Sequence, residues 1–169
     1  MNGSNSITLF ARALLFSVVI LLAGGAKSYA QESDIKASIN AYHAALDSLD
    51  MSKMEPLWAH DINVILINPA DKSVSVGWDA VKKDWQAQFN FLSELKVTQA
   101  DGPHVSVKGD VAWATEIANA VAKSKAGADA GGLVYESDVF EKRDGRWMLV
   151  SHGLSRPVLI SQINSSPKD

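Results

Sequence analysis

A run of strand patterns in the second half of this chain constrains its fold most. Residues 133–142 and 146–155 flank Asp144-Gly145, a dipeptide typical of β-hairpin turns. Two further patterns, 95–107 and 111–123, come before them and are separated by a turn at Lys108-Gly109-Asp110. Because these strands follow a first half with helical periodicity, the order predicts a curved antiparallel sheet folded over helices, a shape that encloses a pocket.

Hydrophobic periodicity in the first half of the chain predicts about three helices. The first has one apolar face with spacings of four, three, four and three, and Asp34 is available as its N-cap; its members are Ile35, Ile39, Tyr42, Leu46 and Leu49. Ser52 to Glu55 has the spacing of a capping box and opens a second, short helix. A buried strand is expected over 62–67, and a third helical face follows Gly77. The predicted fold class is therefore α+β, with a cone-shaped curved antiparallel sheet packed against these helices.

The N-terminus predicts a secretory signal peptide. Residues 2–12 are polar with one positive charge, residues 13–22 are almost wholly apolar, and Ser28-Tyr29-Ala30 places small residues where a signal peptidase reads. We expect residues 1–30 to be removed by cleavage after Ala30, leaving a domain over 31–160 and a flexible tail over 161–169. The protein is then periplasmic or secreted, without stable membrane insertion after cleavage.

Charge and cysteine usage exclude several classes of function. The net charge is −3, and loss of Arg12 and Lys27 with the signal leaves −5, with acidic and basic residues interspersed. Nucleic acids and anionic membrane surfaces are therefore not expected partners. The chain has no cysteine, which excludes disulfides, thiol catalysis and cysteine metal sites.

Several segments resemble one known family. The resemblance rests on the order of the elements and on four parts of the sequence: residues 58–61 before the first strand, Gly77 before the third helix, residues 109–113 and residues 139–147. Together they are similar to the nuclear transport factor 2-like superfamily in its SnoaL-like branch, over about 34–157. The resemblance implies the cone-shaped fold. It does not fix the function, because that cone carries isomerases, cyclases, dehydratases, hydrolases, oligomerisation modules and binding proteins.

The ketosteroid isomerase members of this superfamily offer a closer comparison. Tyr42 resembles their oxyanion-binding tyrosine, and Asp138 resembles their protonated acid on a late strand. Their general base is an aspartate before a proline, where this chain has Asn68-Pro69. Because an amide has no basic lone pair, ketosteroid isomerase activity is not expected. Tyr42 and Asp138 could still bind a ligand oxygen without performing a reaction.

Other side chains are candidates for catalysis or ligand binding. His152 is expected to point inward, on the same side of its strand as Met148, Val150 and Leu154. Asp61 and Glu116 are acidic candidates, but we expect each of them to be exposed or to cap a helix. The four histidines lack a recognised ligand spacing, so neither a metal nor a cofactor is expected. An aromatic-rich interior is expected from the segments that carry Trp58, Trp78, Trp85, Phe89 and Trp113.

Three functions of different class remain open at this point. The first is a pocket that binds a small, flat or cyclic apolar molecule, with the ligand-binding set Tyr42, Trp58, Asn68, Trp85, Phe89, Trp113, Asp138 and His152. The second is an isomerase, cyclase or hydrolase whose catalytic candidates are His152, Asp61 and Asp138. The third is an oligomerisation module without a ligand. A homodimer through the outer face of the sheet is expected in each case.

Overall fold

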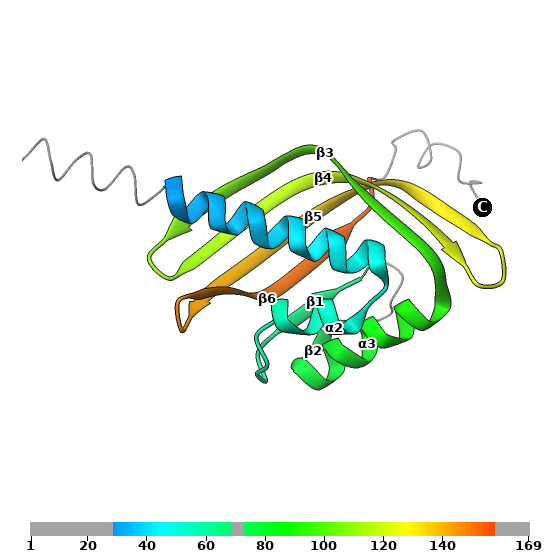
Figure 1. Cartoon of the computed structure of the whole chain (residues 1–169), viewed down its shortest axis with the longest axis horizontal. Helices are drawn as coiled ribbons and strands as arrows, with labels where there is room; N and C mark the ends of the chain where they lie inside the picture. The colour runs from blue at the N-terminus through cyan, green and yellow to red at the C-terminus, as the bar shows by residue number, and fades with distance from the viewer. Residues whose placement is uncertain (1–28, 69–72, 158–169) are drawn as a thin grey trace, which may run out of the picture.

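The computed structural model describes residues 29–68 and 73–157. A long helix over 29–48 runs along the concave side of a curved sheet, and two shorter helical segments lie near its end (Figure 1). These segments are α2 (Met51–Met54), which continues into the 3₁₀ helix η1 (Glu55–Leu57), and α3 (Trp78–Phe91). No helix in this described part is long and apolar enough to span a membrane.

The sheet has six strands in the order β2-β1-β6-β5-β4-β3. Two are short, β1 (Ile65–Ile67) and β2 (Ser75–Val76); the long strands are β3 (Leu92–Lys108), β4 (Val111–Ser124), β5 (Asp129–Arg143) and β6 (Arg146–Ser155). All neighbours pair antiparallel except β1 and β6, which are parallel. The expected α+β cone is thus present, and its sheet is mixed rather than wholly antiparallel.

The curvature of the sheet has a local cause in β3. Its register with β4 shifts between Gln99 and His104, around Gly102. Gly102 has a φ of +92°, and a Cβ there would lie 3.0 Å from the carbonyl oxygen of Thr115. Bulges of this kind bend a strand, and β3 arches over the helices in Figure 1.

The core lies between the long helix and the concave face of the sheet. The predicted helical face is confirmed, since Ile35, Ile39, Tyr42 and Leu46 are all buried. From the sheet, Ala112, Ala114 and Ala118 of β4 lie opposite this helix face as buried small residues. Small side chains on the strand let the helix approach the sheet closely, which fixes the position of the helix residues that face inward.

Several predicted boundaries were wrong. Asp34 lies inside the first helix rather than at its N-cap, because helical structure already includes residues 29–33. The cap of α2 is Asp50, whose side chain accepts a hydrogen bond from the Ser52 backbone N–H at 2.8 Å. The strand expected over 62–67 is limited to Ile65–Ile67.

Candidate functional site

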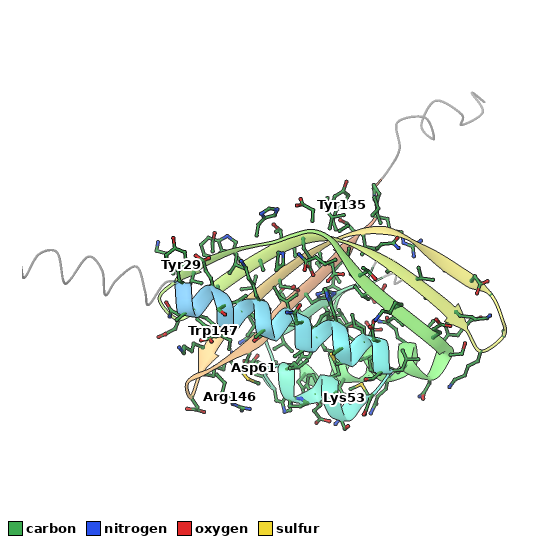
Figure 2. All side chains as sticks on the ribbon, turned by 45° about the horizontal axis from the view of Figure 1, so that its top comes forward. Tyr29, Lys53, Asp61, Tyr135, Arg146 and Trp147 are labelled. Atoms are coloured by element: carbon green, nitrogen blue, oxygen red, sulfur yellow. The ribbon has the colours of Figure 1, made fainter. Side chains whose placement is uncertain are left out.

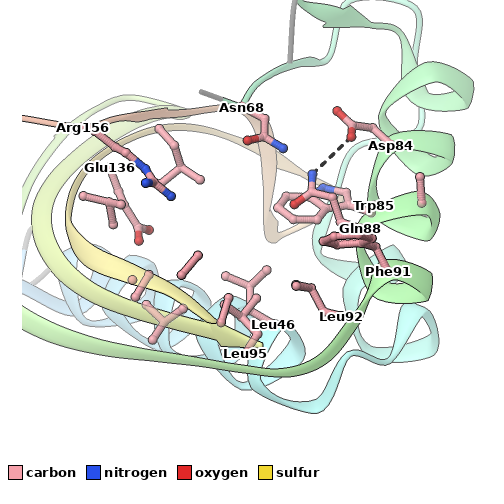
Figure 3. Close-up of a pocket in the computed structure, with 18 residues that line it drawn as sticks. Leu46, Asn68, Asp84, Trp85, Gln88, Phe91, Leu92, Leu95, Glu136 and Arg156 are labelled. Atoms are coloured by element: carbon pink, nitrogen blue, oxygen red, sulfur yellow. Dashed lines mark hydrogen bonds between the residues drawn. The ribbon is translucent and has the colours of Figure 1, made fainter. Parts of the chain in front are cut away.

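A cavity of about 370 Å³ lies at the end of the cone where α3 meets β3 (Figure 3). Its walls come from α3, from the start of β3, and from the hairpin end of β4 and β5. Most of the lining is apolar, including Leu46, Trp85, Phe91, Leu92, Leu95 and Val134. A volume of this size is typical of sites for small organic molecules.

Polar side chains stand on two sides of this cavity. Glu136 and Arg156 occupy one side, and Asp84 faces them from α3 (Figure 3). Gln88 donates a hydrogen bond to Asp84 at 3.1 Å, which holds that carboxylate in the wall. Asn68, directly after β1, also lines the cavity. The cavity therefore joins an apolar body to a few polar groups that could orient a ligand.

Beside the cavity, a row of acidic side chains crosses the concave face of the sheet. Glu116 of β4 and Glu136 of β5 are direct register partners and are only 4% and 2% exposed. Asp138 lies two residues further along β5 and is 4% exposed. Glu136 and Asp138 share a face because they are two residues apart on one strand, and Glu116 shares that face because it is the register partner of Glu136. All three carboxyl groups therefore point into the core.

His43 of the long helix reaches the two glutamates. Its Nε2 lies 2.9 Å from Glu116 Oε1 and 3.3 Å from Glu136 Oε2. Burial alone would lower the pKa of His43, but its hydrogen bonds to Glu116 and Glu136 outweigh burial and raise the pKa to about 10. The imidazole is therefore charged at neutral pH and partly neutralises the facing carboxylates.

His152 of β6 forms a second buried pair with Asp138. The His152 Nδ1 lies 2.7 Å from Asp138 Oδ1, and the His152 side chain is fully buried. Burial lowers the pKa of His152, while the charge of Asp138 and the hydrogen bond to it raise the pKa, with a net shift upward. Asp138 is thus one member of a hydrogen-bonded pair rather than an isolated acid in an apolar site.

A β-bulge at Val150 is what turns His152 inward. Ser151 pairs with Val139, but Leu149 pairs with Phe140, so Val150 is the extra residue on β6. Trp147 and Leu149 point into the core before the bulge, and His152 points into it after the bulge. The prediction that His152 faces inward was correct, but its expected companions Met148 and Val150 lie only partly buried because the bulge shifts the alternation.

Three buried polar atoms near this pair have no hydrogen-bond partner within the described residues. They are the Tyr42 hydroxyl, Trp85 Nε1 and His152 Nε2. The rings pack together, with Tyr42 centred 4.8 Å from His152 and 6.0 Å from Trp85. Burial raises the pKa of Tyr42 well above 10.0, and the charges of Glu136, Asp138 and Asp84 add to this, so the hydroxyl remains a donor.

Comparison with known proteins decides the family. A family model for the SnoaL-like domain matches residues 35–159. The chain belongs to the SnoaL-like domain family. None of the curated proteins matches this sequence.

Solved structures share the fold of this SnoaL-like domain. A nuclear transport factor 2-like superfamily protein from Salmonella enterica has a TM-score of 0.70 at 20% identity, over 76% of this chain and 92% of that one. An NTF2-like protein of unknown function from Pseudomonas putida gives 0.68 at 18% identity, over 80% and 92%. The association domain of C. elegans CaMKII gives 0.61 at 20% identity, over 77% and 98%. At these identities the likeness establishes the NTF2-like fold alone.

The SnoaL-like fold brings some of the predicted site residues together. Asn68 and Trp85 line the cavity, Tyr42 and His152 pack against the Trp85 ring, and Asp138 pairs with His152. Trp58 and Phe89 are buried but do not line this cavity; Trp58 instead forms a bridge to Leu149 of β6.

Two other expectations need correction. Trp113 does not face the cavity, because it is 45% exposed on the outer face of β4, where the alternation of the strand places it. Asp61 lies outside the cavity wall, and its carboxylate pairs with Arg143 at 2.6 Å. A hydrogen bond from the Asn63 backbone, followed by that from Arg143, lowers the pKa of Asp61, so it is a poor general base.

The sequence interpretation missed His43, Glu116 and Glu136 as a group. Glu116 was expected to be exposed, yet every second residue of β4 from Ala112 to Ala118 is buried. Alanines at these positions gave a usable signal, because small apolar residues in alternation mark the covered face of a strand. Glu136 lies in the same alternation with Val134 on β5 and could have been found in the same way.

Proposed function

We propose that this SnoaL-like protein binds a small, flat or cyclic organic molecule in the cavity between α3 and the sheet. The apolar body of the ligand would lie against Trp85, Phe91 and Leu95, and a hydroxyl group would donate a hydrogen bond to Glu136. The observation that carries this proposal is the buried Glu136 carboxylate in the wall of a largely apolar cavity. A carboxylate has several acceptor positions, so Glu136 can accept a hydrogen bond from a ligand in addition to its contact with His43.

The unpartnered polar atoms at and beside Trp85 support the same proposal. Leaving a buried donor without an acceptor costs about 1–3 kcal/mol, and Tyr42, Trp85 and His152 each carry one such unpartnered atom. A ligand oxygen that reached past Trp85 would satisfy these donors. An oligomerisation module would need no such cavity, so the cavity favours the ligand-binding hypothesis.

A second candidate is an enzyme that uses His152 as its proton acceptor or donor. The fully buried Asp138–His152 pair favours it, since the carboxylate orients the ring and leaves Nε2 for a substrate. His152 does not line the cavity, however, and the Trp85 ring lies 6.2 Å from it. Ketosteroid isomerase chemistry is not proposed, because Asn68 in the cavity wall provides no base.

Export and dimerisation belong to the same proposal. Cleavage after Ala30 would leave the helix from Gln31 onward, including Ile35, the first buried side chain of that helix. The outer face of the sheet exposes Val111, Trp113, Val121, Leu133 and Tyr135, and Figure 2 shows Tyr135 on the side away from the long helix. Such a patch favours a homodimer across this face.

Binding of 2-naphthol, measured by tryptophan fluorescence in the presence of EDTA, tests the ligand proposal. We expect saturable binding that is weaker for naphthalene, which has the same ring system without the hydroxyl group. Ala120→Phe fills the cavity and should abolish binding, whereas Ala100→Phe, on an exposed part of β3, should not. Equal binding by both alanine variants, or none by the wild type, would refute the proposed site.

A further inference from the structure

We propose that His43, Glu116 and Glu136 form a binding site for one divalent transition-metal ion. The site combines one residue of the long helix with two register partners on β4 and β5. It stands on its own geometry and does not depend on the proposed organic ligand.

The spacing of the donor atoms fits such an ion. One ligand atom from each of the three side chains lies within 4.8 Å of the other two. The His43 Nε2 is 2.9 Å from Glu116 Oε1 and 3.3 Å from Glu136 Oε2. Zinc-to-ligand distances of about 2.0–2.1 Å place neighbouring ligand atoms about 2.9–3.4 Å apart for bond angles between octahedral and tetrahedral values.

An unpartnered carboxylate oxygen points to the same conclusion. Glu116 Oε2 is buried and has no hydrogen-bond partner within the described residues. Two carboxylates that face each other across neighbouring strands repel one another, and one imidazole can neutralise at most one of them. A divalent cation would displace the proton from His43 Nε2 into solvent, satisfy the free oxygen and balance both carboxylate charges.

The chemistry of the donors selects the class of ion. Imidazole nitrogen with carboxylate oxygen suits Zn²⁺, Mn²⁺, Fe²⁺ and Co²⁺, whereas Mg²⁺ and Ca²⁺ prefer oxygen donors alone. The absence of cysteine removes the soft ligands that favour copper(I). Three protein ligands also leave a coordination position open, as in catalytic zinc sites.

Glu136 connects this metal site to the cavity. It is a member of the cluster and also lines the cavity wall (Figure 3). An ion could enter from the cavity along this side chain, and its open coordination position would lie at the inner end of the cavity. Metal and organic ligand would then be neighbours, although each is tested without the other.

The direct test uses protein without a polyhistidine tag that has been stripped of metal with EDTA. Zn²⁺ is titrated into this protein, and binding is measured by isothermal titration calorimetry. We expect one ion per chain and a higher melting temperature, while Mg²⁺ and Ca²⁺ at the same concentrations have no effect. No organic ligand is present, so failure here would leave the 2-naphthol experiment unaffected. Absence of Zn²⁺, Mn²⁺ and Co²⁺ binding to the wild type would overturn the proposal.

Matched variants locate the ion. His43→Asn and Glu116→Gln should each weaken Zn²⁺ binding by at least about tenfold, since even residues that only orient metal ligands contribute that much. His104→Asn and Glu94→Gln change the same residue types at exposed positions and should leave binding unchanged. Loss of binding in the control variants alone would place the ion elsewhere and refute this site.

A crystal structure of the wild type grown with Zn²⁺ decides the matter if a variant does not fold. Anomalous scattering at the zinc edge should place the ion between His43 Nε2 and the two glutamate carboxylates. An anomalous peak at another position, or none at this one, would overturn the proposal.

Discussion

Glu116 and Glu136 face each other across β4 and β5, and the His43 imidazole lies within 3.3 Å of both carboxylates. In the absence of metal, this imidazole is the positive group that makes the opposed pair tolerable. The three side chains therefore act as one electrostatic unit, and their substitutions should have unequal effects.

His43→Asn should destabilise the metal-free protein far more than Glu116→Gln does. Loss of His43 leaves two buried carboxylates without their positive partner, which costs about 3–5 kcal/mol in the free energy of unfolding. Loss of the Glu116 charge leaves one carboxylate paired with His43 and should cost less than about 1.5 kcal/mol. Urea unfolding in EDTA measures both, with His104→Asn as the control. Equal destabilisation by His43→Asn and Glu116→Gln would contradict the proposed electrostatic unit.

Asp138→Asn should also lower the free energy of unfolding by about 3–5 kcal/mol, because it breaks the buried pair with His152. The pKa of His152 is raised in the folded state, so its pairing contributes fully below its unfolded pKa of about 6.5. That contribution is lost as the pH rises through the higher folded-state pKa. The difference between wild type and Asp138→Asn should therefore be largest near pH 6 and shrink in alkaline solution. A difference that grows with pH would have the wrong sign.

Deletion of Val150 should remove the bulge and leave His152 in the core. Val150 is the extra residue in the bulge on β6, and without it Ser151 follows Leu149 directly, so regular alternation places Ser151 outward and His152 inward. Diethyl pyrocarbonate modification, read by mass spectrometry, should leave His152 unmodified in both the wild type and the deletion variant. His104 is exposed and provides an internal standard in both proteins. Modification of His152 in the deletion variant would show that Val150 is not the extra residue of this bulge.

The outer face of the sheet should hold two copies together. Trp113 and Tyr135 are 45% and 43% exposed on this face, and light scattering should report a dimer at micromolar concentration. The double substitution Trp113→Glu and Tyr135→Glu should give a monomer, because it would bury like charges at the interface. Ser52→Glu on the exposed surface of α2 is the control. A wild type that stays monomeric at every concentration would refute the dimer.

Local patterns were sufficient to predict the inner helix face and the long strands. Ile35, Ile39 and Tyr42 repeat with the period of a helix, and Asp144-Gly145 marks a hairpin, so neighbouring residues carry this information. The parallel pairing of β1 with β6 joins segments about half the chain apart, and no local pattern encodes it.

The candidate site was only partly predictable for the same reason. Tyr42 and His152 were identified singly, but their contact depends on the bulge at Val150 and on how the helix lies on the sheet. His43, Glu116 and Glu136 come from three separate elements, so their spacing in sequence resembles no known ligand motif. Burial made these residues candidates, and burial emerges only when the elements pack.

The most direct test of the ligand-binding account is a crystal structure of the protein with 2-naphthol bound. The account predicts the ring system in the cavity against Trp85 and Phe91, with the hydroxyl group within hydrogen-bond distance of the Glu136 carboxylate. Glu136→Gln should keep the ring in place and weaken binding in solution, since a charged acceptor becomes a neutral amide. Density for 2-naphthol elsewhere on the molecule, with this cavity empty at saturating ligand, would contradict the account.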